Sequence, residues 1–593
     1  MERLKRTVTC GGIRVNHVGH RVVLNGWVHR QRDHGGVLFF DIRDRYGLSQ
    51  IVVDADSAPE LQEIAAELKF EYCVAVAGIV RHRPDGMVNT AMPTGHVEVQ
   101  ALDIEILSRC DSLPFVIDER VDAREELRMR YRYLDLRSAS MQRKLKLRHD
   151  VAFAIREYLV EQGFYEIETP TLIRSTPEGA RDFLVPSRVF PGKFYALPQS
   201  PQLFKQILMV SGFDKYFQIA RCFRDEDARG DRQIEHTQID IEMSFVSKEK
   251  IFGIVEGFLA HVFEKVLGKT LATPFERLTY AEAMGRYGSD KPDIRYGLEL
   301  ADFNAYAAQG GFRVFQTVVA GGGSVRCLVV PGGGEFPRSK IDELEKTAKI
   351  HGAQGLAWMK VTDGGIEGGI AKFYQPSAST ILAALKASAG DLLLFVGADL
   401  KTACTALGAV RSTLAAQLDL IPTDEFRFCW VTDFPLFEWD SEENRWAASH
   451  HMFTMPQPEY IPTLEESPAS VKGELYDLVC NGVELASGSI RIHDIELQKR
   501  IFKIVGISDE EAQDRFGFLL DAFKYGPPPH GGIAPGLDRL VMLMAGETSI
   551  REVIAFPKTT QGASLMDDTP AGIDSSQLKE LHLQVLWDQE TPD

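Results

Sequence analysis

The side chains best suited to chemistry lie in residues 216–245, which predict two strands joined by a long charged segment. Polar and apolar residues alternate in both runs, so each strand has an apolar face for a core and an opposite polar face. The polar face of the second run carries His236, Gln238, Asp240, Glu242 and Ser244. The first run leads into Arg224, and a guanidinium at the end of such a platform suits a phosphate or a carboxylate. The alternation by itself is also compatible with an amphipathic hairpin on a protein surface.

The connection between the two runs, DEDARGDRQI at 225–234, is too long and too charged for a tight hairpin turn. Long ordered loops in compact domains are usually functional. We therefore expect this loop to take part in any site that the polar face forms.

Length and composition indicate a large, ordinary globular protein. With 593 residues, the chain is long enough for roughly four domains by the usual domain size. It is 44% hydrophobic and 25% charged, which is typical of a soluble globular protein. The formal net charge of -18 argues against a histone-like binder of nucleic acid. It does not exclude nucleic acid, because an acidic protein can carry a local basic face.

The cysteines and the N-terminal residues predict a cytoplasmic protein. Eight cysteines are scattered without a CxxC pair or a Cys/His cluster, so we expect reduced thiols and no structural zinc. The first residues, MERLKRTVTC, are not followed by the apolar run of a signal peptide.

Residues 1–106 contain five short β segments with one helical stretch between them, which predicts a small closed barrel of the OB-fold type. Such barrels often bind single-stranded nucleic acid. The first hairpin has two cations, an aromatic ring and an amide that could serve this purpose, namely Arg30, Arg32, Phe39 and Gln50. Phe39 could equally be a core residue of its strand.

The next segments predict a hinge, a long helix and an interface strand. Residues 107–140 are charged and irregular, and 144–163 has helical periodicity that stops at Gly163. The strand expected at 164–172 is interrupted by Pro170, which suits a sheet edge or an interface.

Residues 291–424 differ in composition from the segments on either side. Glycine-rich runs separate alternating strand and helix signals, which predicts an α/β module inserted into another domain. Neither GxxxxGK[ST] nor a GxGxxG following a strand is present, so these glycines are expected to be structural turns. Beyond 425 the chain returns to the kind of sequence found before 291, with a strand pair expected at 428–439 and a glycine-rich strand leading into a helix near Leu537.

Three separated elements together resemble the three motifs of class II aminoacyl-tRNA synthetases. They are the strand with Pro170, the run FRDE (223–226) with RQIEHTQIDIE (232–242), and GLDRL (536–540). QSPQLFKQ (199–206) and the N-terminal barrel narrow the resemblance to the aspartate/asparagine/lysine subclass. The glycine-rich insertion resembles the GAD domain of the bacterial aspartate enzymes, which the asparagine and lysine enzymes lack. The motifs occur in order and span nearly the whole chain.

This resemblance implies a multidomain α+β fold: an N-terminal OB-fold β-barrel, a class II catalytic core built on an antiparallel sheet, and an inserted α/β GAD-like domain. The implied order is an anticodon-binding barrel (1–106), a hinge (107–140), the first part of the core (141–290), the insertion (291–424), the second part of the core (425–560) and a C-terminal extension (561–593).

The implied activity is the ATP-dependent attachment of L-aspartate to tRNA, through an aspartyl-adenylate and then transfer to the tRNA 3′ end. Arg224 can fork across the reacting carboxylate and the α-phosphate, where charge develops in the transition state. Arg539, at a helix N-terminus, is placed to hold the ATP phosphates. The resemblance makes these two arginines catalytic and gives Asp477 and Glu484 as the Mg²⁺ ligands, a role that suits hard oxygen donors.

Matching the family's motifs residue by residue gives the remaining contacts. Aspartate would be bound by Glu178, Gln202, Lys205, Arg224, Asp240, His450 and Arg491. ATP would be bound by Arg224, Asp225, Glu226, Gln233, Glu484, Gly536, Leu537, Asp538 and Arg539. Which of Asp240 and Glu242 contacts the substrate stays open. A cationic pocket favours aspartate over neutral asparagine, because asparagine would leave a desolvated arginine partly unpaired.

In this family the barrel reads the anticodon, with Phe39 stacking and Arg32 and Gln50 donating or accepting hydrogen bonds. His34 and Gly86 resemble the non-discriminating form, which charges both tRNA(Asp) and tRNA(Asn). Neutral drift in these loops is the alternative, and the enzyme would then be strictly specific for tRNA(Asp).

The resemblance also implies a homodimer formed through the strand with Pro170 and a functional link to a tRNA-dependent amidotransferase. Two other functions are compatible with parts of the pattern: an inactive, synthetase-like RNA-binding regulator, and a tRNA-independent asparagine synthetase built on the same core. Intact catalytic residues disfavour the first, and the barrel and insertion disfavour the second.

Overall fold

A computed structural model describes residues 4–176 and 179–586. Contacts divide the chain into two compact units: residues up to Lys146 together with Ser564–Thr569, and Leu147–Ala563 together with the residues after Thr569. Each unit is described by itself. Within the described residues, none of the helices has both the length and the apolar character that a membrane span requires.

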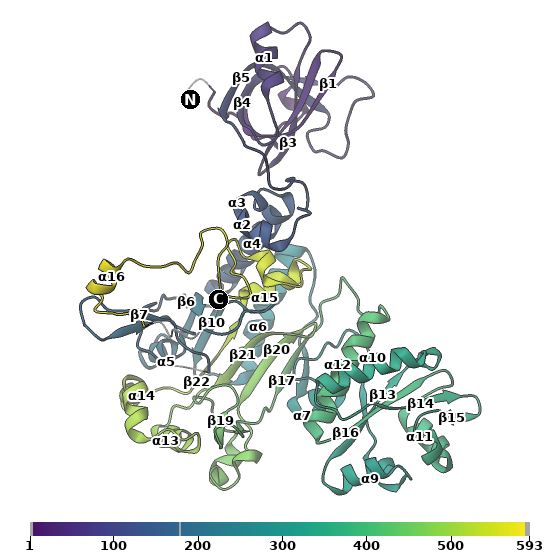
Figure 1. Cartoon of the computed structure of the whole chain (residues 1–593). Coiled ribbons are helices and arrows are strands. Elements are labelled where there is room, and N and C mark those ends of the chain that lie inside the picture. The colour runs from purple at the N-terminus through teal and green to yellow at the C-terminus, as the bar shows by residue number, and fades with distance from the viewer. Residues whose placement is uncertain (1–3, 177–178, 587–593) are drawn as a thin grey trace. The chain divides into compact units, whose positions relative to one another are not determined.

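The first unit contains the expected barrel (Figure 1). Its strands are β1 (Arg21–His34), β2 (Val37–Asp44), β3 (Gly47–Val53), β4 (Cys73–His82) and β5 (Val97–Ser108). They close in the order β1-β2-β3-β5-β4, and the helix α1 (Pro59–Glu67) lies between β3 and β4 in the chain. Alternate residues such as Leu24, Phe40 and Ile51 fill the interior.

The segment expected to be an irregular hinge contains two short helices, α2 (Glu125–Arg130) and α3 (Arg132–Asp135). Its charges are paired internally, because Arg128 Nε lies 3.0 Å from Asp135 Oδ1 and Arg132 Nη1 lies 2.5 Å from Asp135 Oδ2. Asp135 is fully buried. These ion pairs explain why a segment with so many charges is ordered.

The second unit is built on an eight-stranded sheet in the order β11-β17-β20-β21-β22-β10-β9-β6. The strands are β6 (Tyr165–Glu166), β9 (Lys215–Phe223), β10 (Glu235–Ser244), β11 (Glu276–Thr279), β17 (Phe428–Thr432), β20 (Leu475–Cys480), β21 (Val483–Ile490) and β22 (His530–Pro535). All neighbours are antiparallel except the two end pairs, β11 with β17 and β6 with β9. This is the antiparallel core that the motifs implied.

Three helices cover the apolar face of this sheet: α4 (Ala139–Glu161), α6 (Lys248–Val262) and α15 (Leu537–Met544). Their side chains pack with Ile239, Ile241 and Trp430 of the strands in one buried cluster. A second cluster, under the opposite part of the unit, joins α5 (Gln202–Val210), α13 (Ile495–Ile504) and α14 (Asp509–Phe523). The sheet can therefore present a polar face to a site while its other face is sealed.

Two expected strands differ from the structure. The strand at 164–172 is reduced to Tyr165–Glu166, because the chain leaves the sheet before Pro170. The pair expected at 428–439 is two strands of different sheets: β17 joins the large sheet, whereas β18 (Phe437–Asp440) pairs with β19 (Arg445–Ala448). Asp433 between them has φ +58°, so the chain turns there instead of forming a hairpin of β17 with β18.

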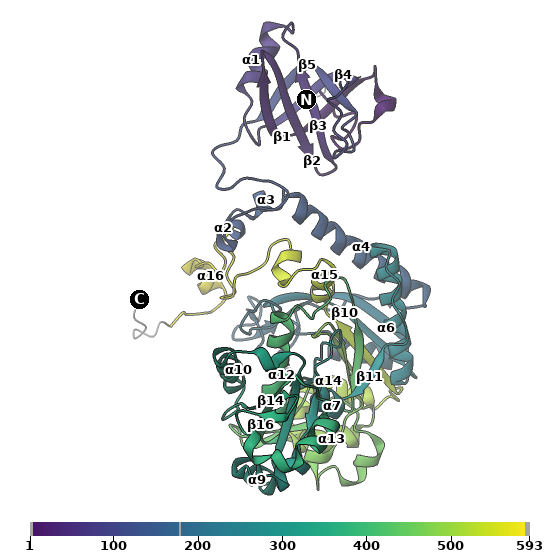
Figure 2. The same cartoon turned by 90° about the vertical axis from the view of Figure 1, so that its right-hand side faces the viewer.

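The inserted module, defined here as β12 through α12, forms its own five-stranded sheet in the order β12-β13-β16-β14-β15. Figure 2 shows two of these strands, β14 and β16, with helices of the module around them. Its strands are β12 (Leu300–Asp302), β13 (Ser324–Val330), β14 (Ala357–Thr362), β15 (Gly365–Glu367) and β16 (Leu392–Ala398). Helices α10 (Arg338–Ile350) and α12 (Leu400–Gln417) cover one face, and α8 (Asn304–Gln309), α9 (Arg313–Ala320) and α11 (Ala378–Leu385) cover the other. Glycines in turns of the module, such as Gly332 (φ +68°) and Gly390 (φ +94°), adopt left-handed backbone, whereas the glycine-rich run at 363–369 includes strand β15.

Candidate active site

The hairpin of β9 and β10 pairs Phe223 with Glu235 and has residues 224–234 as its connecting loop. Its polar face is not on the surface, because Asp240 and Glu242 are both 0% exposed. β10 lies between β9 and β22 inside the large sheet. The alternative of an amphipathic surface hairpin is therefore wrong, and the polar face must serve an internal site.

This polar face is the floor of a cavity of about 400 Å³. The cavity brings together residues from α5, the hairpin loop, β10, β21 and the start of α15. Twelve of the residues named by the motif resemblance line it: Gln202, Lys205, Arg224, Glu226, Gln233, Asp240, His450, Glu484, Arg491, Gly536, Asp538 and Arg539. Asp225, Leu537 and Asp477 are not in its lining, and Glu178 lies outside the described residues.

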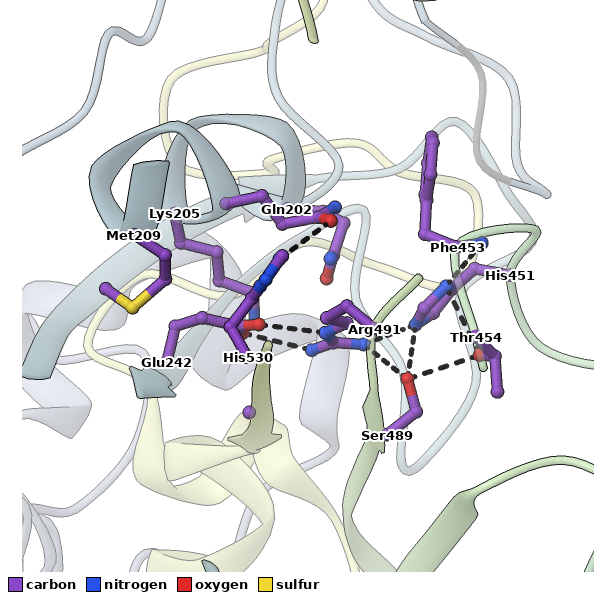
Figure 3. A network of polar contacts seen from close by, with 12 residues as sticks. Gln202, Lys205, Met209, Glu242, His451, Phe453, Thr454, Ser489, Arg491 and His530 are labelled. Atoms are coloured by element: carbon purple, nitrogen blue, oxygen red, sulfur yellow. Dashed lines mark hydrogen bonds and ion pairs between the residues drawn. The ribbon is translucent and has the colours of Figure 1, made fainter. Parts of the chain in front are cut away.

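Two buried cations of the cavity lining, Lys205 and Arg491, are paired with buried carboxylates. Figure 3 shows both cations with one of these carboxylates, Glu242. Arg491 donates from Nε and Nη2 to the two oxygens of Glu242 at 3.0 and 3.1 Å, and Lys205 Nζ lies 2.9 Å from Asp240 Oδ1. Asp240 lines the cavity, whereas Glu242 does not. Glu242 is therefore the internal partner of both cations, and Asp240 is the carboxylate that a ligand can reach.

The remaining Nη1 of Arg491 donates to Ser489 Oγ at 2.8 Å and also to His451 Nε2 (Figure 3). Burial, followed by the charge of Arg491, holds the pKa of His451 well below its ordinary value, so this imidazole is neutral and can accept a hydrogen bond. His451 lines the cavity but was not among the predicted site residues. The only available signal was its position beside His450 in the loop SHHMFT.

The cavity lining also contains Arg224 and Arg539. Arg539 is held in place, because its Nη1 donates to the Glu484 carbonyl oxygen at 2.8 Å and its Nη2 donates to Asp231 Oδ2 at 3.1 Å. The Nε of Arg224 is buried and has no hydrogen-bond partner among the described residues. A buried donor without a partner is costly, so this guanidinium is prepared for an anionic ligand.

His236, on β10, lies beside both arginines. Burial and the neighbouring charges of Arg224 and Arg539 lower the pKa of His236 to about 3. The imidazole is therefore uncharged across the neutral pH range and adds no positive charge beside Arg224 and Arg539. The alternation placed His236 on the polar face, but only the structure shows that it lies next to the arginines.

We expect the His236 resonance to stay at its neutral position down to pH 5, while exposed histidines titrate near their ordinary pKa. Histidine-selective ¹³C labelling of the protein and of His236→Gln identifies the signal by its absence in the variant. Substitution of Arg224 by glutamine should raise this pKa, since it removes one repelling charge. A His236 signal that titrates between pH 6 and 7 in the wild-type protein would contradict the burial seen here.

Two carboxylates at the cavity edge come from the hairpin of β20 and β21. Burial, and then the charge of Glu484, raises the pKa of Asp477 well above its ordinary value. Asp477 Oδ1 is buried and has no hydrogen-bond partner among the described residues. Burial would also raise the pKa of Glu484, but Lys291, with its Nζ 2.8 Å from Glu484 Oε2, brings that pKa below its ordinary value.

The pair formed by Asp477 and Glu484 fits a magnesium ion that is shared with phosphates. No cluster of three or more metal-binding side chains occurs among the residues that the structure describes. Mg²⁺ usually takes one or two protein carboxylates and completes its shell with water and substrate phosphates. The unpartnered oxygen of Asp477 and the ionised Glu484 beside the cavity meet this requirement.

The GLDR run serves mainly to place Arg539. Leu537 is buried in the core, and Asp538 accepts the backbone N–H of Thr237 at 2.8 Å and forms an ion pair with Arg148. Asp538 thus ties the first turn of α15 to β10. Arg539 extends from this turn toward the loop residue Asp231 and lines the cavity together with Gly536 and Asp538.

The residues predicted to contact nucleic acid lie in the barrel, and all but Gln50 are at least partly exposed. Arg32 and Phe39 are cross-strand partners, and the His34 and Phe39 rings pack edge to face at 6.0 Å. Phe39 is half-buried, while its neighbour Phe40 fills the core, so Phe39 remains available for stacking. Gln50 is only 8% exposed and donates to Glu98. Gly86 (φ +79°) lies in the β4–β5 connection, with open space where a side chain would be.

Two family models match the chain. The model described as tRNA synthetases class II (D, K and N) matches residues 124–560, and the model described as an OB-fold nucleic acid binding domain matches residues 22–107. The first covers the core sheet and the inserted module, and the second covers the barrel. Both agree with the resemblance that the motifs indicated.

Several curated relatives match over nearly the full length. The aspartate–tRNA(Asp/Asn) ligase of Treponema denticola is 59% identical, covering 99% of this chain and 100% of the relative. The ligase of the same name from Moorella thermoacetica is 54% identical, covering 98% and 97%. A relative from Macrococcus caseolyticus, named aspartate–tRNA ligase, is 50% identical and covers 98% of both chains.

Solved structures share the fold at low sequence identity. The asparaginyl-tRNA synthetase of Pyrococcus horikoshii, complexed with asparaginyl-adenylate, has a TM-score of 0.60 at 20% identity, covering 94% of this chain and 98% of that one. The aspartyl-tRNA synthetase of Entamoeba histolytica has a TM-score of 0.55 at 19% identity, covering 92% and 89%.

Proposed function

The chain belongs to the class II tRNA synthetases of the D, K and N group, and from this we propose that it attaches L-aspartate to tRNA(Asp) and tRNA(Asn) with ATP as co-substrate. The observation that carries this proposal is one cavity lined by four cationic side chains: Lys205, Arg491, Arg224 and Arg539. Aspartate has two carboxylates and ATP has a chain of phosphates, so a cationic lining suits both substrates.

The side-chain carboxylate of aspartate suits the pair of Lys205 and Arg491. Both cations are buried, and Glu242 and Asp240 already balance them, so an incoming carboxylate must share their donors. Asparagine offers one oxygen and an amide nitrogen, and the nitrogen cannot accept from a guanidinium or an ammonium. Bound asparagine would therefore leave buried donors of Lys205 or Arg491 unpaired. This cost is the strongest available basis for discriminating aspartate from asparagine. Gln202, with its Nε2 buried and unpartnered among the described residues, is a further donor.

Arg224 and Arg539 suit formation of the adenylate. A carboxylate oxygen of aspartate attacks the α-phosphorus and pyrophosphate leaves, so negative charge accumulates on the α-phosphate oxygens. Arg224 is the group assigned to that charge, and Arg539 is assigned to the departing phosphates. Glu226 and Gln233, from the loop, complete the assigned ATP contacts. Asp477 and Glu484 would hold Mg²⁺, which when bound neutralises part of the phosphate charge.

Dimerisation, location and a downstream partner extend this proposal. Tyr165 and Leu172, on either side of Pro170, are exposed apolar residues, as expected for a surface that pairs with a second copy. We propose a homodimer formed there and a cytoplasmic location. Aspartate attached to tRNA(Asn) must be converted to asparagine before use, which requires an amidotransferase that acts on charged tRNA.

We expect purified tRNA(Asn) to be charged with aspartate at a rate within about tenfold of tRNA(Asp). The names of several relatives support both substrates, as do His34 and Gly86, which resemble the non-discriminating form. Aminoacylation with radiolabelled aspartate measures the rate for each tRNA. Charging of tRNA(Asp) alone would establish the strictly specific enzyme instead.

Phe39→Ala should lower tRNA charging by about 10- to 100-fold, because stacking of a base on an aromatic ring is worth about 1–3 kcal/mol. Aspartate-dependent ATP–pyrophosphate exchange should be unchanged, since that step takes place in the other unit. Phe39→Tyr, which keeps an aromatic face, is the matched control and should charge tRNA nearly normally. An equal fall in exchange and charging would show that the barrel substitution acts on folding.

A further inference from the structure

The connection between the core and the inserted module brings a lysine to the edge of the cavity. Residues 288–299 join α7 (Tyr280–Tyr287) to β12. Within this connection, Lys291 Nζ lies 2.8 Å from Glu484 Oε2. Glu484 lines the cavity, and its charge acts on buried Asp477. A cation from outside the catalytic motifs therefore sits at the carboxylate pair.

A buried arginine of the inserted module holds this connection. Arg411, on α12, is 2% exposed. Its guanidinium donates to the carbonyl oxygens of Asp293, Tyr296, Gly297 and Leu298 at 2.8 to 3.1 Å. It also donates to the Tyr296 hydroxyl at 3.1 Å and stacks over the Tyr296 ring at 4.1 Å. Such a set fixes the path of the connection, because displacing it would leave several buried polar groups unpaired.

The start of the connection is also in backbone contact with α12. A Cβ on Gly288 would lie 2.2 Å from the Cys404 carbonyl oxygen, and one on Gly408 would lie 2.5 Å from the Gly288 carbonyl oxygen. Two glycines thus allow the helix and the turn to touch without intervening side chains. Gly288 also has φ +69°, so it is the point where α7 ends and the connection begins.

The far side of the connection packs on the hairpin that carries the two acids. A Cβ on Gly482, in the β20–β21 turn, would lie 3.3 Å from Asp293 Cβ. Asp293 in turn binds Arg295, whose Nη1 donates to the Pro422 carbonyl oxygen at 2.9 Å, on the return path from the module. The connection is therefore fixed between α12 and the hairpin of Asp477 and Glu484.

We infer that the connection to the inserted module places a resident cation beside the catalytic cavity: Arg411 of α12 positions the connection, and the connection holds the Lys291 ammonium against Glu484. This inference rests on the proposed use of Asp477 and Glu484 as metal ligands. In the ligand-free enzyme Lys291 offsets the negative charge of Glu484. A divalent cation that binds there must do so against this charge, so the free enzyme binds metal weakly until ATP phosphates contribute.

An ordinary surface ion pair does not account for these contacts. Exposed pairs contribute little because water screens them. The Lys291 and Glu484 side chains are 36% and 25% exposed, but the charge of Glu484 acts on the buried Asp477. The connection is also held on either side of Lys291, at Gly288 and at Asp293. Lys291 and Arg411 are positioning residues in this scheme.

Mn²⁺ binding to the full chain without ATP, measured by electron paramagnetic resonance of the free ion, tests the role of Lys291. Lys291→Met should bind Mn²⁺ about tenfold more tightly than the wild-type protein, since one like charge is removed beside the ion. Lys349→Met makes the same change on the exposed face of α10, where Lys349 pairs with Glu345, and should leave affinity unchanged. Equal or weaker binding by Lys291→Met, including no measurable binding by either protein, would overturn the inference.

Arg411→Lys tests whether Arg411 holds the connection, because a lysine keeps the positive charge but cannot make the five hydrogen bonds of the arginine. We expect faster amide hydrogen exchange in 290–298 and Mn²⁺ affinity shifted toward that of Lys291→Met by about threefold. Arg338→Lys, an exposed arginine of the same module, is the matched control. Faster amide hydrogen exchange in 290–298 with an unchanged Mn²⁺ affinity would show that Arg411 does not position Lys291.

Absence of ATP–pyrophosphate exchange in the wild-type protein would refute the proposed function but would leave the difference in Mn²⁺ affinity intact, so the two failures are distinguishable.

Discussion

Arg224→Ala should lower aspartate-dependent ATP–pyrophosphate exchange by about a thousandfold or more, because it removes the cation assigned to the charge that develops on the α-phosphate. The structure makes this the sharpest test in the chain. Arg539 is already tied to Asp231 and to the Glu484 carbonyl, whereas the Arg224 Nε is buried without a partner among the described residues. Binding of tRNA should stay close to normal, since the barrel residues are untouched.

Arg221→Ala is the matched control for this experiment. Arg221 lies three residues before Arg224, on the opposite face of β9, and pairs with the half-exposed Glu235. Loss of such a pair costs at most about 1 kcal/mol. Exchange should therefore remain near the wild-type rate in Arg221→Ala. Near-normal exchange in Arg224→Ala would show that the motif was assigned to the wrong residue, and an equally inactive Arg221→Ala would point to general damage to the hairpin.

Arg491→Met should lower the free energy of unfolding of the core by about 3–5 kcal/mol, because it leaves Glu242 buried without its bidentate partner. Aspartate activation should fall as well, since Arg491 lines the cavity. Urea unfolding followed by tryptophan fluorescence measures the first effect, and the KM for aspartate in the exchange reaction measures the second. Lys205 Nζ remains near Glu242, at 3.3 Å from Oε2.

The double variant Arg491→Met with Glu242→Gln separates the two effects. It removes the unpaired charge, so stability should recover by more than half while the KM for aspartate stays raised. If both properties recovered together, Arg491 would be a structural residue only.

The pair of Arg491 and Glu242 also predicts how acid acts on the core. Burial would raise the pKa of Glu242, but Arg491 and Lys205 bring it below its ordinary value. Its contribution to stability is therefore present above the ordinary pKa of a glutamate and is lost as pH falls through the lower folded value. Arg491→Met should lose this part of the acid sensitivity.

Much of the architecture followed from local patterns. Alternation of polar and apolar residues predicted β9 and β10, and the GLDR run predicted the start of α15. These elements are encoded within a few residues, because strand and helix periods are local properties of the backbone. Patterns failed where partners were remote: the pair expected at 428–439 belongs to two sheets, and the choice of sheet depends on β20 and β19.

The hairpin that carries Arg224 shows which features follow from the local sequence and which depend on the tertiary structure. The sequence alone determined that Asp240 and Glu242 share one face, because residues two apart in a strand always do. It could not distinguish the residue that meets a ligand from the one that holds the cations. Arg491, 249 residues along the chain, pairs with Glu242 and leaves Asp240 at the cavity. The surroundings of Lys291 and His236 likewise became known only from the structure. Burial and ion pairing depend on neighbours that only the folded chain brings together.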